Sequence, residues 1–229
     1  MLSQKLILEQ YEKARQKKPP VKPRLKIDRL KPLDPSELFE GELFVSKAVT
    51  NAKLTDANFS HRSFCESAFT NSSFQECDFS DTSFEDVVFS GCDFSVADFT
   101  SAGFKRCAFD NCKLTGTTLF ESYFENVVIQ NSLLTFATCS QSKWKNISLA
   151  KCDLSEADFC AMQLSSASIE DCKIVCASFF KTSLAGLDLT TCTIEGVTIS
   201  DSMSELQGCK MGTNQLATFA SMLGIVIEE

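Results

Sequence analysis

The sequence predicts an all-β solenoid, in which the chain winds through short flat sides and turns a corner every five residues. The first observation is a large apolar residue at every fifth position from Leu54 to Ile199, without insertion or deletion, and Cys139 is the one exception in size. The second is a smaller residue two positions before these, as at Ala57 and Cys77. The third is that most of the remaining positions are polar.

A period of five fits no simple helix or strand. Five steps of about 100° spread a marked residue around a helix axis, and an odd period moves it from one face of a strand to the other. A corner after every fifth residue instead points one large and one small side chain inward from each short side. The same register extends toward the N-terminus through Phe39, Phe44 and Val49.

The short segments that carry this pattern resemble the repeat of the pentapeptide-repeat proteins. They are Ala57-Asn58-Phe59, Cys77-Asp78-Phe79, Ala97-Asp98-Phe99, Cys152-Asp153-Leu154 and Ala157-Asp158-Phe159. The resemblance covers about residues 39 to 203. It implies a right-handed quadrilateral parallel β-helix with four repeats in each coil, and we expect about eight coils with short capping helices at both ends.

A 20-residue coil stacks every fourth repeat in a column. One expected column contains Phe44, Phe64, Phe84, Phe104, Phe124 and Trp144, followed by Leu164 and Leu184. Seven of the 12 cysteines fall in the small inward position: Cys77, Cys92, Cys107, Cys112, Cys152, Cys172 and Cys192. We interpret them as small buried hydrophobes in a reduced interior, in preference to a metal or redox ladder, because no CxxC pair occurs.

Residues 1–33 form a separate segment, predicted to be a flexible basic arm that contains proline. Ten lysines and arginines stand against three acids there, with four prolines between them. The arm is interpreted as a solvated linker. The alternative is contact with nucleic acid, with a partner or with the acidic rod of the same chain, through Lys17, Lys18, Lys22, Arg24, Lys26 and Arg29.

The repeat domain is predicted to span residues 34–203. Asp34-Pro35-Ser36-Glu37 indicates a helix start, because Asp34 can cap it, proline suits its first position and Glu37 can reach back. This short helix is expected to cover the open N-terminal end of the solenoid.

Residues 204–229 are predicted to close the other end. From Thr213 the apolar residues have helical spacing, and one side of that helix is expected to cover the last coil. The ending is similar to the C-termini of the quinolone-resistance (Qnr-type) branch of the family, and the resemblance implies a homodimer. The residues expected at this dimer contact are Leu216, Phe219, Leu223, Ile225 and Ile227.

The charge of the rod is strongly negative where that of the arm is positive. Seven acids and no base lie between Phe74 and Phe99, and they are expected to form the surface that binds a partner: Glu76, Asp78, Asp81, Glu85, Asp86, Asp93 and Asp98. Such a surface repels nucleic acid and attracts basic proteins. Direct nucleic-acid binding is therefore expected only through the arm.

The sequence favours a protein without enzymatic activity. His61 is the single histidine, and neither GxxxxGK[ST] nor GxGxxG occurs. No cofactor, metal or small-molecule substrate is expected. No secretory signal or membrane-spanning segment is visible, so we expect a cytoplasmic protein.

The resemblance to the Qnr-type branch implies a DNA mimic. Such a protein binds and protects or modulates a type II topoisomerase, DNA gyrase or topoisomerase IV, and can give quinolone resistance. The alternative is a general protein-interaction scaffold or adaptor that uses the rod face or the basic arm.

Overall fold

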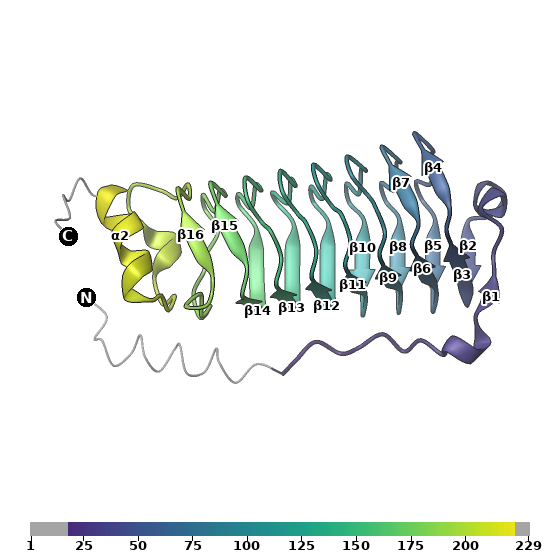
Figure 1. Ribbon diagram of the computed structural model, residues 1–229, viewed down its shortest axis with the longest axis horizontal. Coiled ribbons are helices and arrows are strands. Elements are labelled where there is room, and N and C mark those ends of the chain that lie inside the picture. The colour runs from purple at the N-terminus through teal and green to yellow at the C-terminus, as the bar shows by residue number, and fades with distance from the viewer. Residues whose placement is uncertain (1–17, 223–229) are drawn as a thin grey trace.

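The polar-and-apolar repeat winds into a straight rod whose sides are built from short parallel strands (Figure 1). The computed structural model describes residues 18–222. It is a parallel β-solenoid of about eight turns, as predicted. The strands are β1 (Lys31–Pro32), β2 (Leu43–Val45), β3 (Lys47–Thr50), β4 (Lys53–Thr55), β5 (Ser63–Cys65), β6 (Ala68–Thr70), β7 (Ser73–Gln75), β8 (Ser83–Glu85), β9 (Val88–Ser90), β10 (Gly103–Lys105), β11 (Ala108–Asp110), β12 (Tyr123–Gln130), β13 (Lys143–Ala150), β14 (Gln163–Glu170), β15 (Lys173–Val175) and β16 (Thr193–Glu195).

Strand pairing confirms the 20-residue coil. In β2 and β5 Phe44 pairs with Phe64, and the same register continues strand by strand to Trp144 and Leu164. The rings stack along the column: the centroids of Phe84 and Phe104 are 4.9 Å apart and their planes differ by 6°. These buried columns form the core of the rod and stabilise it by removing apolar area from water.

Each corner has a backbone conformation that the sequence repeat did not predict. Every fifth residue from Ser46 to Gly186 has a positive φ angle, so each corner places one residue in the left-handed region. Asn, Asp and Gly adopt this region at the least steric cost. The coil is therefore four short sides joined by four left-handed corners, and the side chain at each corner points outward.

The N-terminal end is closed by a short 3-10 turn, η2 (Pro35–Phe39), instead of an α-helix. The predicted cap is present: Asp34 Oδ1 accepts a hydrogen bond from the backbone of Ser36 at 2.9 Å, and Glu37 accepts one from the backbone of Asp34 at 3.0 Å. Leu38 is buried beneath the turn. Only five residues separate the cap from Glu40, which leaves no length for further helical turns.

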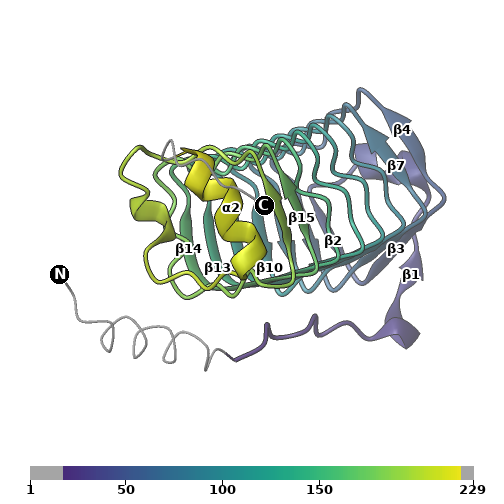
Figure 2. The same cartoon turned by 60° about the vertical axis from the view of Figure 1, so that its left-hand side comes forward.

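The C-terminal end departs from the expected boundary at residue 203. Asp188 pairs with Lys210, so the last coil contains 22 residues and the solenoid continues to Lys210. The turn η3 (Ser204–Leu206) takes up the extra length, and its N-cap Met203 has a positive φ. The helix α2 (Thr213–Met222) then lies across the end of the rod (Figure 2).

The side chains of Gln215 and Phe219 hold helix α2 against the end of the rod. Gln215 Nε2 donates to the carbonyl oxygens of Leu189 and Cys192, at 2.7 and 2.6 Å, and Phe219 packs against the apolar core. The prediction that one side of this helix closes the last coil is therefore confirmed. Within residues 18–222, no helix has the length and apolar character needed to cross a lipid bilayer.

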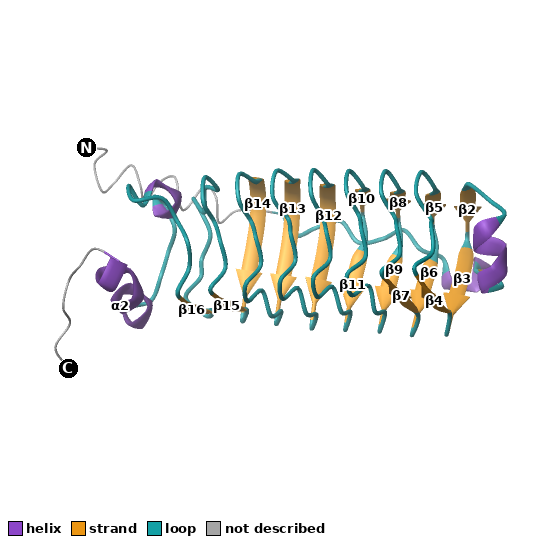
Figure 3. Ribbon diagram, turned by 90° about the horizontal axis from the view of Figure 1, so that it is seen from above, coloured by secondary structure: helices purple, strands orange, loops and turns teal. Residues whose placement is uncertain are grey.

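The described part of the basic arm runs back along the rod (Figure 1). It leads from residue 18 through the short turn η1 (Ile27–Arg29) to β1, which pairs in parallel with β3. Seen from above, the strands of successive coils form regular rows, and the arm passes behind them (Figure 3).

Candidate functional site

One side of the rod carries most of its uncompensated negative charge. We call it the acidic face, and it comprises residues 56–61, 76–81, 96–101, 116–121, 136–141, 156–161, 176–181 and 196–201. Its nine carboxylates are Asp56, Glu76, Asp78, Asp81, Asp98, Glu121, Glu156, Asp158 and Asp201, and its one lysine is Lys181. On each of the two adjoining sides of the coils, acids and bases are equal in number between residues 42 and 205.

The backbone holds the central row of these carboxylates in one orientation. Oδ1 of Asp78 accepts from the N–H of Ser80 at 2.8 Å, and Asp98 accepts in the same way from Thr100 at 2.8 Å. Asp158 repeats the contact with the N–H of Cys160 at 2.9 Å. One carboxylate oxygen thus closes a local turn, and the row is displayed at intervals fixed by the coil.

Lysine and arginine do not neutralise this face. Within residues 18–222, none of its nine carboxylates lies in an ion pair with a lysine or an arginine. Among the described residues of the face, His61 Nδ1 lies 3.8 Å from a carboxylate oxygen of Asp81, and both side chains are exposed. On the adjoining side, by contrast, Asp93 and Asp153 lie 3.6 and 3.5 Å from lysines of the next coil.

The structure divides the seven acids expected from the sequence among different sides. Glu76, Asp78, Asp81 and Asp98 lie on the acidic face. Asp93 lies on one adjoining side, Glu85 lies on the other in β8, and Asp86 lies at the corner that follows Glu85, outside the acidic face. The sequence reasoning missed five acids of the face: Asp56, Glu121, Glu156, Asp158 and Asp201. Counting acids by their position in the 20-residue coil would have found them.

Asp86 is the most enclosed of the seven. Its side chain accepts two hydrogen bonds from the guanidinium of Arg106, and the N–H of Arg24 donates to Oδ1 at 2.9 Å. Burial opposes ionisation of Asp86, but the bonds from Arg106 and Arg24 outweigh it and hold its pKa below the ordinary value. This carboxylate is engaged inside the molecule and is not open to a partner.

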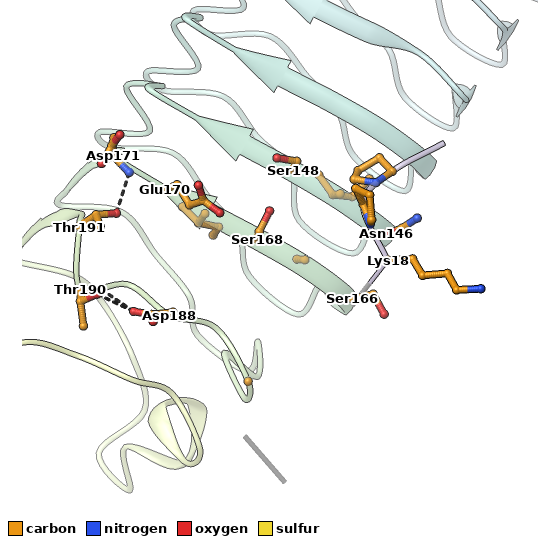
Figure 4. A pocket seen from close by; sticks show the side chains of 16 residues that line it. Lys18, Asn146, Ser148, Ser166, Ser168, Glu170, Asp171, Asp188, Thr190 and Thr191 are labelled. Carbon is orange, nitrogen blue, oxygen red and sulfur yellow. Dashed lines mark hydrogen bonds between the residues drawn. The ribbon is translucent and has the colours of Figure 1, made fainter. Parts of the chain in front are cut away.

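The described arm residues lie away from the acidic face. Arg24 meets the corner that contains Asp86, and Lys18 borders a groove of about 640 Å³ between the arm and the rod. Figure 4 shows Lys18 and Asn146 at one end of this groove and Asp171 at the other. Five of the expected arm residues are exposed: Lys18, Lys22, Arg24, Lys26 and Arg29. Lys17 lies outside the described residues.

The residues expected at the C-terminal contact separate into two groups. Leu216 is 54% exposed on α2, whereas Phe219 is 5% exposed and faces the last coil of its own rod. Phe219 therefore belongs to the cap, because its ring is covered within the chain. Leu223, Ile225 and Ile227 lie outside the described residues.

The described residues include no set of three or more metal-ligating side chains close enough to hold a metal ion. The cysteines of the small inward position are buried and unpaired. Burial raises the pKa of the Cys107 thiol to about 12, which keeps it protonated at neutral pH. These thiols fill space in the core, as their position in the repeat predicts.

Comparisons with known proteins agree with this geometry. A family model of pentapeptide repeats, in eight copies, matches residues 52–91 and 77–116. A comparison with curated proteins finds no match. A trypsin-treated form of QnrB1, a plasmid-mediated fluoroquinolone resistance protein, is similar to 81% of this chain over 93% of its own length, with 21% identity and a TM-score of 0.52.

Full-length QnrB1 gives a similar result. It is 20% identical, with a TM-score of 0.52, over 85% of this chain and 95% of its own. At this identity the likeness shows a shared fold. Residues 52–116 therefore carry pentapeptide repeats, and the chain shares the fold of pentapeptide-repeat β-helix structures.

Proposed function

We propose that this protein is a non-enzymatic DNA mimic that binds a type II topoisomerase such as DNA gyrase, and that it protects or modulates the enzyme. The observation that carries the proposal is the acidic face, where nine carboxylates and one lysine follow one side of a rigid rod. Eight coils at about 4.8 Å each give a length of roughly 40 Å. That is about the length of 12 base pairs of duplex DNA.

The position of the acidic face supports this role. A surface that normally grips DNA is basic, and a row of carboxylates on a rigid body offers it the same sign of charge as a phosphate backbone. Val21 and Arg24 of the arm bond to Asn126 and Asp86, at a corner outside the acidic face, so they leave that face open. The fold shared with QnrB1, a fluoroquinolone resistance protein, also favours a topoisomerase as the partner.

The C-terminal end supports a homodimer in this proposal. Leu216 is exposed on a helix that covers the end of the rod. Association of two copies through this end would join two rods lengthwise and double the extent of the acidic face. The burial of Phe219 leaves Leu216 as the described residue that can meet a second copy.

The experiment compares two triple substitutions with equal changes in net charge. Asp78→Asn, Asp98→Asn and Asp158→Asn remove three charges from the acidic face, and an asparagine oxygen can still accept the turn bond, as Asn58 does. The matched control, Asp93→Asn, Asp153→Asn and Asp188→Asn, removes three carboxylates from other sides that accept the same turn bond.

The readouts are binding to purified gyrase, supercoiling activity and its inhibition by a quinolone. We expect the acidic-face variant to bind gyrase at least about 10-fold more weakly and the control to change by less than about 3-fold, because complementary charge acts through the contact surface. If both variants lose gyrase binding equally, the loss depends on net charge and not on the acidic face. If the natural chain binds no topoisomerase, the proposal is wrong and the general scaffold is favoured.

A further inference from the structure

Two hydrogen bonds, two coils apart, join the arm to one corner of the rod. We call this column of left-handed residues the arm corner: Glu66, Asp86, Arg106, Asn126, Asn146 and Ser166. The N–H of Val21 donates to Asn126 Oδ1 at 3.2 Å, and the N–H of Arg24 donates to Asp86 Oδ1 at 2.9 Å. Three arm residues therefore span the two coils that separate Asn126 from Asp86.

This spacing selects one backbone conformation for the arm. Two coils of the rod rise by about 9.6 Å. Three residues of a polyproline II helix rise by about 9.3 Å and return to the same side of its axis. A β-strand covers a similar distance, but its period of two would turn every third N–H away from the rod. A polyproline II segment can therefore bond every second coil with every third residue.

The sequence of the arm favours that conformation. Pro20 and Pro23 each precede a residue that donates to the rod, and both prolines are half-buried. Proline fixes φ near −65° and biases the residue before it toward extended geometry. The segment therefore loses little conformational entropy when it binds.

Bonds within the rod also hold the two acceptor side chains in place, independently of the arm. Asp86 is 6% exposed, and Arg106 holds both of its oxygens. The same Oδ1 of Asn126 that meets the arm also accepts a bond from Asn146 Nδ2 at 2.6 Å. Asp86 is therefore a buried acceptor and Asn126 a half-buried one, and bonds within the rod orient both. Acceptors that are oriented in advance favour binding of a segment whose donors have the same spacing.

We propose that the arm corner is a binding site for an extended basic peptide segment with proline at every third residue. Residues 18–26 are its ligand within the chain, and a separate segment of the same chemistry can take their place. The positive charge of such a segment suits this side of the rod, where six acids stand against four bases: Glu66, Asp86, Asp110, Glu170, Asp171 and Asp188 against Lys47, Arg106, Lys151 and Lys210. The inference stands whether or not the protein binds a topoisomerase.

The first test measures hydrogen exchange of single amides by NMR in the full-length protein. After correction for intrinsic rates, the amides of Val21 and Arg24 are expected to exchange about 10-fold more slowly than those of Lys22 and Lys26, the effect of one hydrogen bond. Equal exchange at all four amides would overturn the proposal.

A matched pair of variants tests the register. Arg24→Pro and Lys22→Pro each remove one positive charge and add one proline, but only Arg24→Pro removes a donor to the rod. We expect Arg24→Pro to speed exchange at Val21 by about 10-fold and Lys22→Pro to leave it within about 2-fold. If the two variants behave alike, the bonded register is wrong.

A peptide tests whether a separate segment can bind. The peptide with the sequence of residues 18–26, at millimolar concentration to compete with a tethered segment, is expected to speed exchange at Val21 and Arg24. The same peptide with proline in place of its arginine is the control and should have no effect. No acceleration by the first peptide would contradict the proposal that the corner accepts other segments.

Discussion

Asp86 and Arg106 lie one coil apart at the same corner of the rod, and the guanidinium binds both carboxylate oxygens. Arg106 Nε lies 2.7 Å from Oδ1 and Nη2 lies 2.6 Å from Oδ2. Arg106 Nη2 also donates to Glu85. Asp86 and Arg106 are less than 10% exposed, so this is a buried ion pair on which the arm rests.

Removing the arginine of this pair should destabilise the rod. Arg106→Ala leaves Asp86 buried without its charged partner, and we expect the free energy of unfolding to fall by about 3 kcal/mol. Lys105→Ala is the control, because Lys105 meets Glu85 at the surface, and it should cost less than about 0.5 kcal/mol. Urea unfolding followed by the fluorescence of Trp144 measures both. Equal costs would contradict the buried character of the pair.

The same pair predicts how stability depends on pH. The pKa of Glu85 is held below its ordinary value by the hydrogen bond from Arg106, and the pKa of Asp86 is also lowered. A lowered carboxyl pKa contributes stability that is full above the unfolded value, about 4, and is lost as pH falls through the folded value. We expect the free energy of unfolding to drop below about pH 4, and less so in Asp86→Asn. An equal drop in both proteins would contradict this role.

Two apolar residues at corners carry conformational strain. Val96 and Phe136 have φ angles of 61° and 60°, and they are 61% and 55% exposed. Asparagine tolerates this region better, so Val96→Asn is expected to raise the free energy of unfolding by about 1 kcal/mol. The reverse change at another corner, Asn131→Val, should lower it by about as much. Denaturant unfolding tests both, and a loss in Val96→Asn would show that its contacts outweigh the strain.

The exposure of the thiols predicts the order of their reactions. Cys176 is exposed, and three others are half-buried: Cys65, Cys160 and Cys209. A thiol reagent should modify Cys176 first in the native protein and reach the eight buried cysteines only after unfolding. Reducing agent should leave the thermal midpoint unchanged, because the described cysteines are free. Rapid modification of Cys107 in the native state would contradict the packed core.

The proposed dimer predicts the mass in solution. Sedimentation at micromolar concentration should give twice the chain mass of 25.3 kDa. Leu216→Asp should convert the dimer to a monomer, because it places a charge in an apolar contact. Leu43→Asp makes the same change at an exposed leucine near the opposite end and should remain dimeric. A monomer for the natural chain would rule out the dimer.

Much of the core could be predicted from the sequence because its signal is periodic. The apolar residue at every fifth position and the 20-residue coil gave the column from Phe44 to Trp144, and the inward cysteines followed from the same period. Asp34 and Glu37 could be assigned to a cap because their bonds are local. The extra length of the last coil escaped prediction, because the 3-10 turn that absorbs it has no periodic marker.

The surface was harder to predict, since neighbours in the sequence are not neighbours on a wound chain. Asp78 and Asp81 share the acidic face, whereas Asp86, only five residues later, lies at the next corner of the coil, which is outside that face. The interpretation of the arm as a solvated linker also changed, because residues 21 and 24 bond to Asn126 and Asp86.

The sequence by itself determined the solenoid, its coil length and its buried columns, because burial of apolar side chains repeats with the period of the chain. Only the tertiary structure decided which acids share a side, where the arm lies and that Phe219 belongs to the cap. Those features depend on contacts between segments far apart in sequence, and the winding of the coil sets their distances.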